Sequence, residues 1–233
     1  MKKLLFIILF FISGTAQAQV LLSLIFGDKL NSDGLEFGLD GGASWCQIDE
    51  LDSHHSLTSF NLGFYFDIRL NDPWYISTGV LVKSKLGADE LTPQDLDFLD
   101  IVTYPEEGTY SQKINYFQVP ALVRYKFKNN FFLEAGPQFS LMHKAWVEYQ
   151  SEIDDREARI RQYNIDAINR LDAGMTGGLG YKFPKGIGIG LGIRYYYGFA
   201  NVYKELSGSN NSAFFLRASV PIGAGRGKAK DES

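Results

Sequence analysis

The chain has 233 residues, of which 45% are hydrophobic and 15% aromatic, so it suits one sizeable domain and is short for two. A formal net charge of −4, without any basic tract, speaks against nucleic-acid binding. The single cysteine, Cys46, has no partner in the chain and lies in no lipid-attachment motif, so neither a disulfide scaffold nor a lipoprotein is supported.

Residues 1–18 have the pattern of a secretory signal peptide. Two lysines precede the apolar run LLFIILFFI, and Ala16-Gln17-Ala18 is a small-x-small cleavage site. The run is about half the roughly 20 residues that a membrane-spanning helix needs, which disfavours a retained anchor. Export removes both lysines and leaves 21 basic against 27 acidic residues, a net charge of −6.

Residues 19–33 are predicted to form a periplasmic segment. Its stretch VLLSLIFG, residues 20–27, is too apolar to extend freely into water. We expect Leu21, Leu24 and Ile25 to pack against the periplasmic mouth of the domain that follows, the alternative being that they rest at the lipid interface.

From residue 34 to 224, hydrophobic side chains recur at every second position, which is typical of β-strands. Residues 60–70 show the pattern best, because six apolar residues share one face while Asn61, Asp67 and Arg69 lie on the other. Eight such segments occur, and their apolar faces begin and end at Leu35 and Trp45, Phe60 and Leu70, Trp74 and Val82, Phe117 and Phe127, Phe131 and Leu141, Leu171 and Phe183, Ile187 and Phe199, and Phe214 and Ile222.

Short and long connections alternate between these segments, as in membrane barrels with tight periplasmic turns and longer external loops. Residues 71–73, 128–130 and 184–186 form the short ones, and an odd number of turn residues keeps the flanking apolar sets on one face. The long ones are residues 47–59, 86–113, 143–167 and 204–210. With an even number of strands and the N-terminus on the inner side of the membrane, these long connections lie outside the cell.

The pattern therefore predicts an all-β fold, an eight-stranded antiparallel up-and-down transmembrane β-barrel over residues 34–224, followed by a polar C-terminal tail, 225–233. Aromatic residues gather near both ends of the strands, as they do at the two headgroup levels of a membrane. The alternative is a soluble lipocalin-like ligand-binding barrel with the apolar faces inward. The many charges and glycines on the opposite faces fit a crowded lumen better than a solvated exterior.

If the apolar faces meet lipid, a set of charged side chains must fill the lumen. Eight strands leave room only for side chains, so these charges should pair and close the bore, which argues against a diffusion porin. The predicted lumen charge network comprises Glu36, Asp40, Asp67, Arg69, Arg124, Glu134, Asp172, Arg194 and Arg217. Lys83 is expected to face the same way.

The length of one turn predicts which two residues of this network lie opposite each other. If Phe127 lies opposite Phe131 across a three-residue turn, Arg124 faces Glu134 with both side chains inward. An unpaired charge in the lumen would be costly, so we expect an ion pair between these two residues.

Two further motifs contain residue types that can carry chemistry. The glycines Gly188, Gly190, Gly192 and Gly198 alternate within a strand and do not open a helix, so they indicate room for large side chains opposite and not a nucleotide loop. The histidines His54, His55 and His143 lie in long connections, and an outer-leaflet hydrolase using them is the alternative to a non-enzymatic protein. No metal site and no cofactor are predicted.

The charge-rich stretch from Ser151 to Asp166 has two interpretations. Ser151 and Asp154 could cap a helix. Alternation on both sides of the stretch instead favours a hairpin that continues above the membrane, and either structure would offer a contact surface for a partner.

Three segments resemble the PorT-like family of outer-membrane β-barrel proteins. They are EFGLDGGASW (36–45), INYFQVPALVRYKFKNNFFLEAGPQFSLM (114–142) and DAGMTGGLGYKFPKGIGIGLGIRYYYGFANVYKE (172–205). The resemblance implies an eight-stranded membrane barrel and, through the namesake, a link to type IX protein secretion. It implies no catalytic residues, and the strand ending at residues 220–223 lacks a terminal aromatic residue.

The sequence thus predicts a non-enzymatic protein of the Gram-negative outer membrane, serving as a structural or interaction scaffold at the cell surface. The expected partners are outer-membrane lipid and other envelope or secretion proteins, reached through the external loops. Nucleic acid is not expected as a partner, and the barrel is expected to be monomeric.

Overall fold

The computed structural model describes residues 34–222 apart from 154–155 and 185–187. The predicted signal peptide (1–18), the segment 19–33 with its apolar stretch 20–27, and the tail 225–233 lie outside the described residues. Among the described residues, no helix is both long and apolar enough to cross a membrane.

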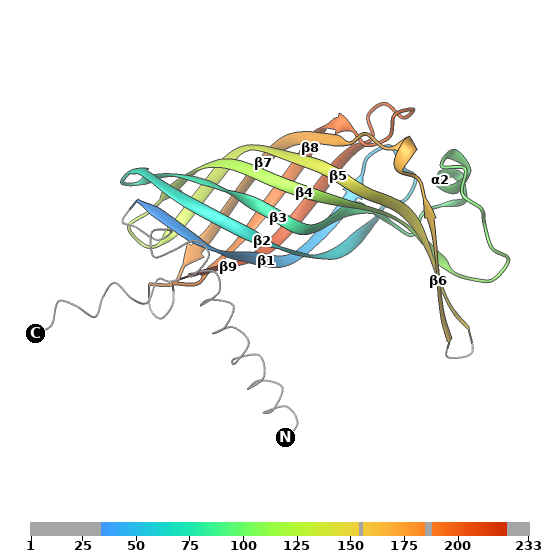
Figure 1. The fold of residues 1–233 in the computed structure, drawn as a ribbon, viewed down its shortest axis with the longest axis horizontal. Coiled ribbons are helices and arrows are strands. Elements are labelled where there is room, and N and C mark those ends of the chain that lie inside the picture. Colours follow the sequence, from blue (N-terminus) through green and yellow to red (C-terminus); the bar gives the residue numbers. More distant parts are fainter. Residues whose placement is uncertain (1–33, 154–155, 185–187, 223–233) are drawn as a thin grey trace, which may run out of the picture.

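Eight antiparallel strands form a closed ring (Figure 1). Neighbours in sequence are neighbours in the ring, apart from a hairpin strand, β6, that lies outside it, and β1 pairs with β9 to close the wall. The predicted fold class is therefore confirmed. The ring strands are β1 (Leu35–Ile48), β2 (His55–Asn71), β3 (Trp74–Asp89), β4 (Thr109–Lys126), β5 (Phe131–Ile153), β7 (Leu171–Lys182), β8 (Gly190–Asn201) and β9 (Asn210–Pro221).

Tight connections lie at one end of the ring, here called the turn end, and the long ones lie at the opposite, loop end. Phe127 donates its backbone N–H to the carbonyl of Phe131 at 2.9 Å, as the predicted three-residue turn requires. After β7, Phe183 donates its backbone N–H to the carbonyl of Ile189 at 2.8 Å, while residues 185–187, which include most of the predicted turn 184–186, lie outside the described residues. Both partners are odd-numbered, so the apolar faces stay aligned.

The apolar faces point outward, as expected for a barrel in lipid. Exposed large side chains occur on all eight ring strands, among them Leu39, Phe60, Val82, Phe117, Leu133, Phe139, Leu179, Leu191 and Leu216. Phe37 differs, since it is buried and its ring packs 4.9 Å from that of Phe66.

Lys83 does not face the lumen, contrary to the expectation. The pairing of β3 with β4 shifts between Leu81 and Ser84, a β-bulge that breaks the alternation. Val82 and Lys83 are consequently both exposed, while Leu81 and Ser84 are buried.

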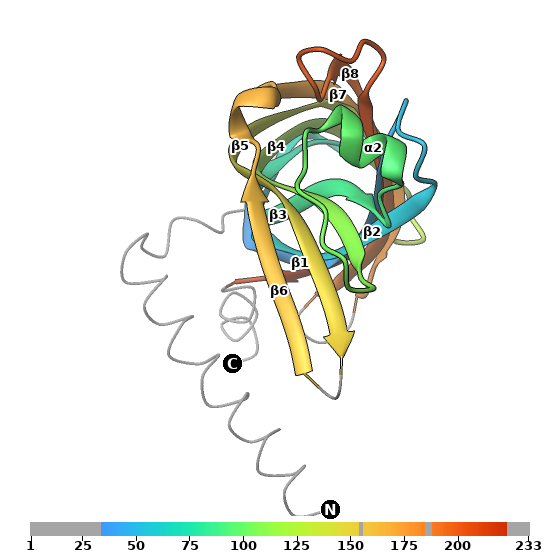
Figure 2. The same ribbon diagram turned by 90° about the vertical axis from the view of Figure 1, so that its right-hand side faces the viewer.

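At the loop end, β5 continues beyond the ring and turns back as β6 (Arg156–Tyr163), which pairs with β5 alone (Figure 2). The extended hairpin is therefore confirmed, and the alternative of a helix here is wrong. Ser151 lies within β5 and contributes no helix cap. A 3-10 turn, η2 (Ile165–Ala167), leads from β6 toward β7.

The long connection between β3 and β4 carries a helix that the sequence analysis did not predict, α2 (Pro93–Phe98). It lies across the loop end of the barrel (Figure 2). Thr92 caps it, and Asp95 completes a capping box, with Pro93 at its first position.

Candidate functional site

Glu134 on β5 is the centre of a buried charge cluster inside the barrel. Its carboxylate accepts hydrogen bonds from Arg124 on β4 (Nη2–Oε2 2.6 Å), Arg217 on β9 (Nη1–Oε1 3.1 Å) and Arg194 on β8. All four side chains are buried. The predicted Arg124–Glu134 pair is thus present, and two further arginines share the same carboxylate.

Two aspartates complete this cluster. Asp67 on β2 pairs with Arg124, and Asp40 on β1 accepts from Arg217 Nε at 3.1 Å to each carboxylate oxygen. Three carboxylates therefore balance three guanidinium groups across the bore. Six strands contribute to this charge sextet, which comprises Asp40, Asp67, Arg124, Glu134, Arg194 and Arg217.

A glycine on β7 allows the sextet to form. Gly178 lies opposite Glu134 on one side and opposite Arg194 on the other. A Cβ atom built on Gly178 would lie 2.8 Å from Cγ of Arg194, so a larger residue would obstruct the path of that side chain to Glu134.

Three members of the predicted network lie outside the sextet. Glu36 pairs with Lys182 and accepts a hydrogen bond from Tyr65 (2.8 Å), nearer the turn end. Arg69 is exposed and pairs with Asp72, because it lies at the very end of β2. Asp172 is buried but accepts from Asn211 Nδ2 (3.0 Å), and no basic residue of the described chain pairs with it.

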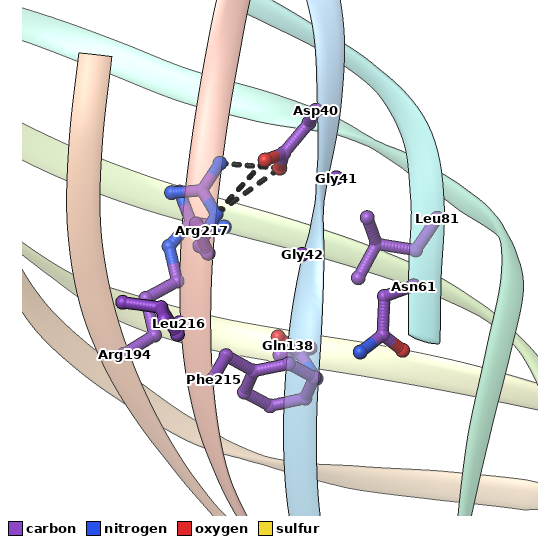
Figure 3. A pocket seen from close by; sticks show the side chains of 10 residues that line it. All are labelled: Asp40, Gly41, Gly42, Asn61, Leu81, Gln138, Arg194, Phe215, Leu216 and Arg217. Carbon is purple, nitrogen blue, oxygen red and sulfur yellow. Dashed lines mark hydrogen bonds and ion pairs between the residues drawn. The ribbon is translucent and has the colours of Figure 1, made fainter. Parts of the chain in front are cut away.

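Little space remains in the bore beside the sextet. A cavity beside Asp40, Asn61 and Arg217 has a volume of about 10 Å³. That is close to the least volume that holds one water molecule. Figure 3 shows Arg217 directed at Asp40 across this space.

The half of the barrel nearer the loop end contains mainly an apolar core, with Asp172 as a buried carboxylate beside it. Its members come from the parts of the strands nearest the loop end and from the long connections. They include Cys46, Leu86, Ile114, Tyr116, Met142, Val147, Ile168, Tyr196, Tyr203 and Phe215. The expectation of a lumen filled by charges therefore holds for one half of the bore only. Leu86 and Val147 lie in residues 86–113 and 143–167, which were expected to be loops, so the alternation did not predict their burial.

Helix α2 closes the apolar core at the loop end. Leu96 and Leu99 are buried in that core, and the ring of Phe98 lies edge-on to Tyr203 at 5.5 Å. The carboxylate of Asp95 also accepts backbone N–H groups of Asp52 (2.9 Å) and Ser53 (3.1 Å), which ties the helix to the β1–β2 connection.

On the part of β5 beyond the ring, Glu148 forms ion pairs with both neighbouring strands, β4 and β6. It accepts from Lys113 Nζ on β4 (2.5 Å) and from Arg161 Nε on β6 (2.7 Å). Burial raises the pKa of Glu148, but the hydrogen bonds from these two bases outweigh it and bring the pKa to about 2. Trp146 packs beside this group, with the Arg161 guanidinium 5.2 Å from its ring centroid.

The histidines do not form a common site. His55, at the start of β2, has its Nε2 3.4 Å from Glu90, which directly follows β3, and both side chains are exposed. His143 stacks on Phe117 with a centroid distance of 4.5 Å on the outer face. Within the described ranges, no group of three or more His, Cys, Asp or Glu side chains could hold a metal ion.

Comparison with protein families gives one match, which covers most of the chain. A family described as outer membrane protein beta-barrel domain matches residues 17–204. A search of curated proteins found no significant match.

Several solved outer-membrane proteins are similar to this chain at low identity. Ail of Yersinia pestis, solved in complex with the heparin analogue sucrose octasulfate, is 14% identical, with a TM-score of 0.42 over 82% of this chain and 99% of that one. Neisserial surface protein A is 10% identical, with a TM-score of 0.40 over 81% and 99% of the two chains. OprG of Pseudomonas aeruginosa is 12% identical, with a TM-score of 0.38 over 81% and 93%.

Proposed function

Since the chain belongs to the outer membrane protein beta-barrel domain family, we propose that it is a closed outer-membrane anchor that presents a sheet edge to a partner protein. The supporting observation is a contrast between the two ends of β5. Inside the ring, its Glu134 is locked in a sextet of paired charges; beyond the ring, the same strand continues into a hairpin with an unpaired edge.

The free edge belongs to β6, which pairs with β5 on one side only. An exposed edge strand carries N–H and C=O groups ready to pair with another extended chain. Arg159, Ile160 and Arg161 are exposed along it, and the strand contains no proline. The surplus of arginine favours an acidic segment as the partner and disfavours a second copy of the same strand.

The direction of the β6 backbone groups can be derived from one hydrogen bond. Asn164 donates its N–H to the carbonyl of Ala145 on β5 (3.3 Å). Alternate residues of an antiparallel strand point the same way, so Gln162 and Ile160 also face β5, whereas Arg161 and Arg159 direct their N–H groups to the free edge.

This geometry gives a matched pair of variants. Arg159→Pro removes a free-edge N–H without breaking a bond to β5, and prolines are tolerated on edge strands. Arg159→Ala removes the same side chain but keeps that N–H. With a photo-crosslinking residue at Glu157 in intact cells, the adduct should form in the wild type, persist at a lower yield in Arg159→Ala, and disappear in Arg159→Pro. An adduct that survives in Arg159→Pro would overturn edge pairing.

The same hairpin also tests which way the barrel faces. With the loop end outside the cell, Glu157→Cys should react with a membrane-impermeant maleimide in intact cells. Lys128→Cys at the turn end should react only after the outer membrane is permeabilised. The reverse pattern would overturn the proposed surface role.

Membership of the PorT-like branch is a finer proposal, supported by the segments 36–45, 114–142 and 172–205. If it holds, the partner of β6 belongs to the type IX secretion route. Deletion of the gene should then reduce the display of proteins that this route exports, and Arg159→Pro should reproduce the loss while Arg159→Ala should not.

A further inference from the structure

Basic side chains gather on the outer face of β3, β4, β5 and β6, where the ring meets the hairpin. Lys85 lies opposite Asn115, which in turn lies opposite Lys144, and Lys113 lies opposite Gly87. On β3 and β4, the even-numbered neighbours Leu86 and Ile114 are fully buried, so Lys85 and Lys113 point outward. Lys144 on β5 is exposed. The basic patch, as we name it, consists of Lys83, Lys85, Lys113, Lys144 and Arg161.

The patch has much more positive than negative charge. Its acidic contact is Glu148, shared by Lys113 and Arg161. Lys83, Lys85 and Lys144 form no ion pair with any described residue. Five bases and one carboxylate leave four net positive charges. The next carboxylate on this face, Asp89, lies farther toward the loop tips and accepts from Ser111.

The patch begins where the lipid-facing belt ends. Val82 on β3, Phe117 on β4 and Leu141 on β5 are exposed apolar side chains, and the basic residues follow within a few positions on each strand. Lys83 Nζ lies 5.5 Å from the ring centroid of the exposed Phe60. Aromatic and basic side chains in this order are typical of the level at which lipid headgroups lie.

The charges within the patch repel one another. Burial lowers the pKa of Lys85, and the nearby charges of Lys113, Lys83 and Arg161 lower it further, while Glu148 offsets only part of this. An anion placed among these side chains would relieve the repulsion, and a phosphate accepts hydrogen bonds from several ammonium groups at once.

We propose that the basic patch binds the phosphate group of an anionic lipid in the membrane leaflet at the loop end. A lipid suits the position better than a free anion, because its acyl chains would lie against Val82, Phe117 and Leu141 while its phosphate reaches the lysines. The proposal is independent of the partner proposed for β6.

The test compares two triple variants of equal net charge. Lys83→Gln, Lys85→Gln and Lys144→Gln together remove the lysines without ion pairs. The control combines Arg69→Gln, Lys128→Gln and Lys204→Gln, which are exposed and lie outside the patch. Each protein is folded into nanodiscs with equal amounts of phosphatidylglycerol and phosphatidylcholine, and the lipids retained after transfer to detergent are counted by native mass spectrometry.

We expect the wild type and the control to retain phosphatidylglycerol over phosphatidylcholine by about tenfold or more, and the patch variant by less than about twofold, because each of the three lysines contributes up to roughly fivefold. Equal enrichment in both variants, or none in the wild type, would overturn the proposal. Adding 10 mM inorganic phosphate distinguishes the source, since displacement of the lipid would indicate a site for free anions. Lys144→Glu alone should also abolish enrichment, and it changes an exposed residue that forms no ion pair with any described residue.

Discussion

Glu134 is the residue whose loss should cost the barrel most. Its carboxylate balances Arg124, Arg194 and Arg217, so Glu134→Ala leaves three buried guanidinium groups with only two aspartates. We expect the free energy of unfolding to fall by about 3 kcal/mol or more. Urea unfolding of the refolded barrel in lipid measures the change, and Glu157→Ala, which breaks an exposed pair with Arg159, is a control expected to cost less than about 1 kcal/mol.

The geometry also predicts that a simple double replacement fails to repair this loss. In the double variant Glu134→Gln, Arg124→Met, Arg194 and Arg217 still lack their carboxylate, and Asp67 loses Arg124. A return to wild-type stability in that variant would mean that the Arg124–Glu134 pair acts alone and that the sextet is not one unit.

Glu148 should make the hairpin sensitive to acid. Its pKa is lowered from 4.5 to about 2 in the folded chain, so its ionised form stabilises the hairpin fully above about pH 4.5. That contribution is lost as the pH falls from about 4.5 toward 2. Hydrogen exchange of the β5–β6 amides, corrected for the intrinsic rate, should be roughly tenfold faster or more at pH 2.5 than at pH 6.

Glu148→Gln separates this effect from general acid unfolding. The variant has no carboxylate to protonate, so exchange of its hairpin amides should vary little over the same range while the ring amides behave as in the wild type. A full acid response in Glu148→Gln would assign the effect to other groups.

Among the elements, α2 depends on one side chain for its attachment. Asp95 both caps the helix and accepts the N–H groups of Asp52 and Ser53. Asp95→Ala should leave these donors unpaired and cost about 1 to 3 kcal/mol, seen as faster exchange in residues 90–108. Asp95→Asn keeps one acceptor oxygen and should lose less; an equal loss in both would point to the negative charge and not to the hydrogen bonds.

The ring strands are predictable from sequence because alternation is carried through each short turn. Parity alone places Arg124 opposite Glu134, since these residues lie ten positions apart on one hairpin. It cannot place Arg194 or Arg217 at Glu134, because those contacts cross the lumen and depend on the register of the whole ring. It also fails at Lys83, where the bulge between Leu81 and Ser84 reverses the facing of the chain.

Helix α2 and the apolar core beneath it escaped prediction for a different reason. Thr92-Pro93 followed by Asp95 is a helix-start signal, but the helix has only six residues, too few to show helical periodicity. Leu96 and Leu99 therefore read as loop residues. Their burial depends on the end of the barrel that they cover, which local sequence does not describe.

At the scale of the whole molecule, two seals in series should prevent conduction. The sextet closes the bore in one half, and the apolar core closes it in the other. We expect no stepwise ion current in planar bilayers from the wild type. Arg217→Ala should also stay silent, because the apolar core remains. Currents from the wild type would refute a closed lumen, and currents from Arg217→Ala alone would show that the second seal leaks.

The sextet also has a consequence for the order in which the barrel forms. Glu134 meets Arg124 within one hairpin, but Arg194 and Arg217 lie 60 and 83 residues away, and the Asp40–Arg217 contact spans 177 residues. The long-range partners can meet only once both ends of the chain have arrived, and such loops are slow to close. The pairing of the interior charges and the pairing of β1 with β9 therefore occur together, late in folding. A partly assembled barrel wall cannot complete its charge pairing.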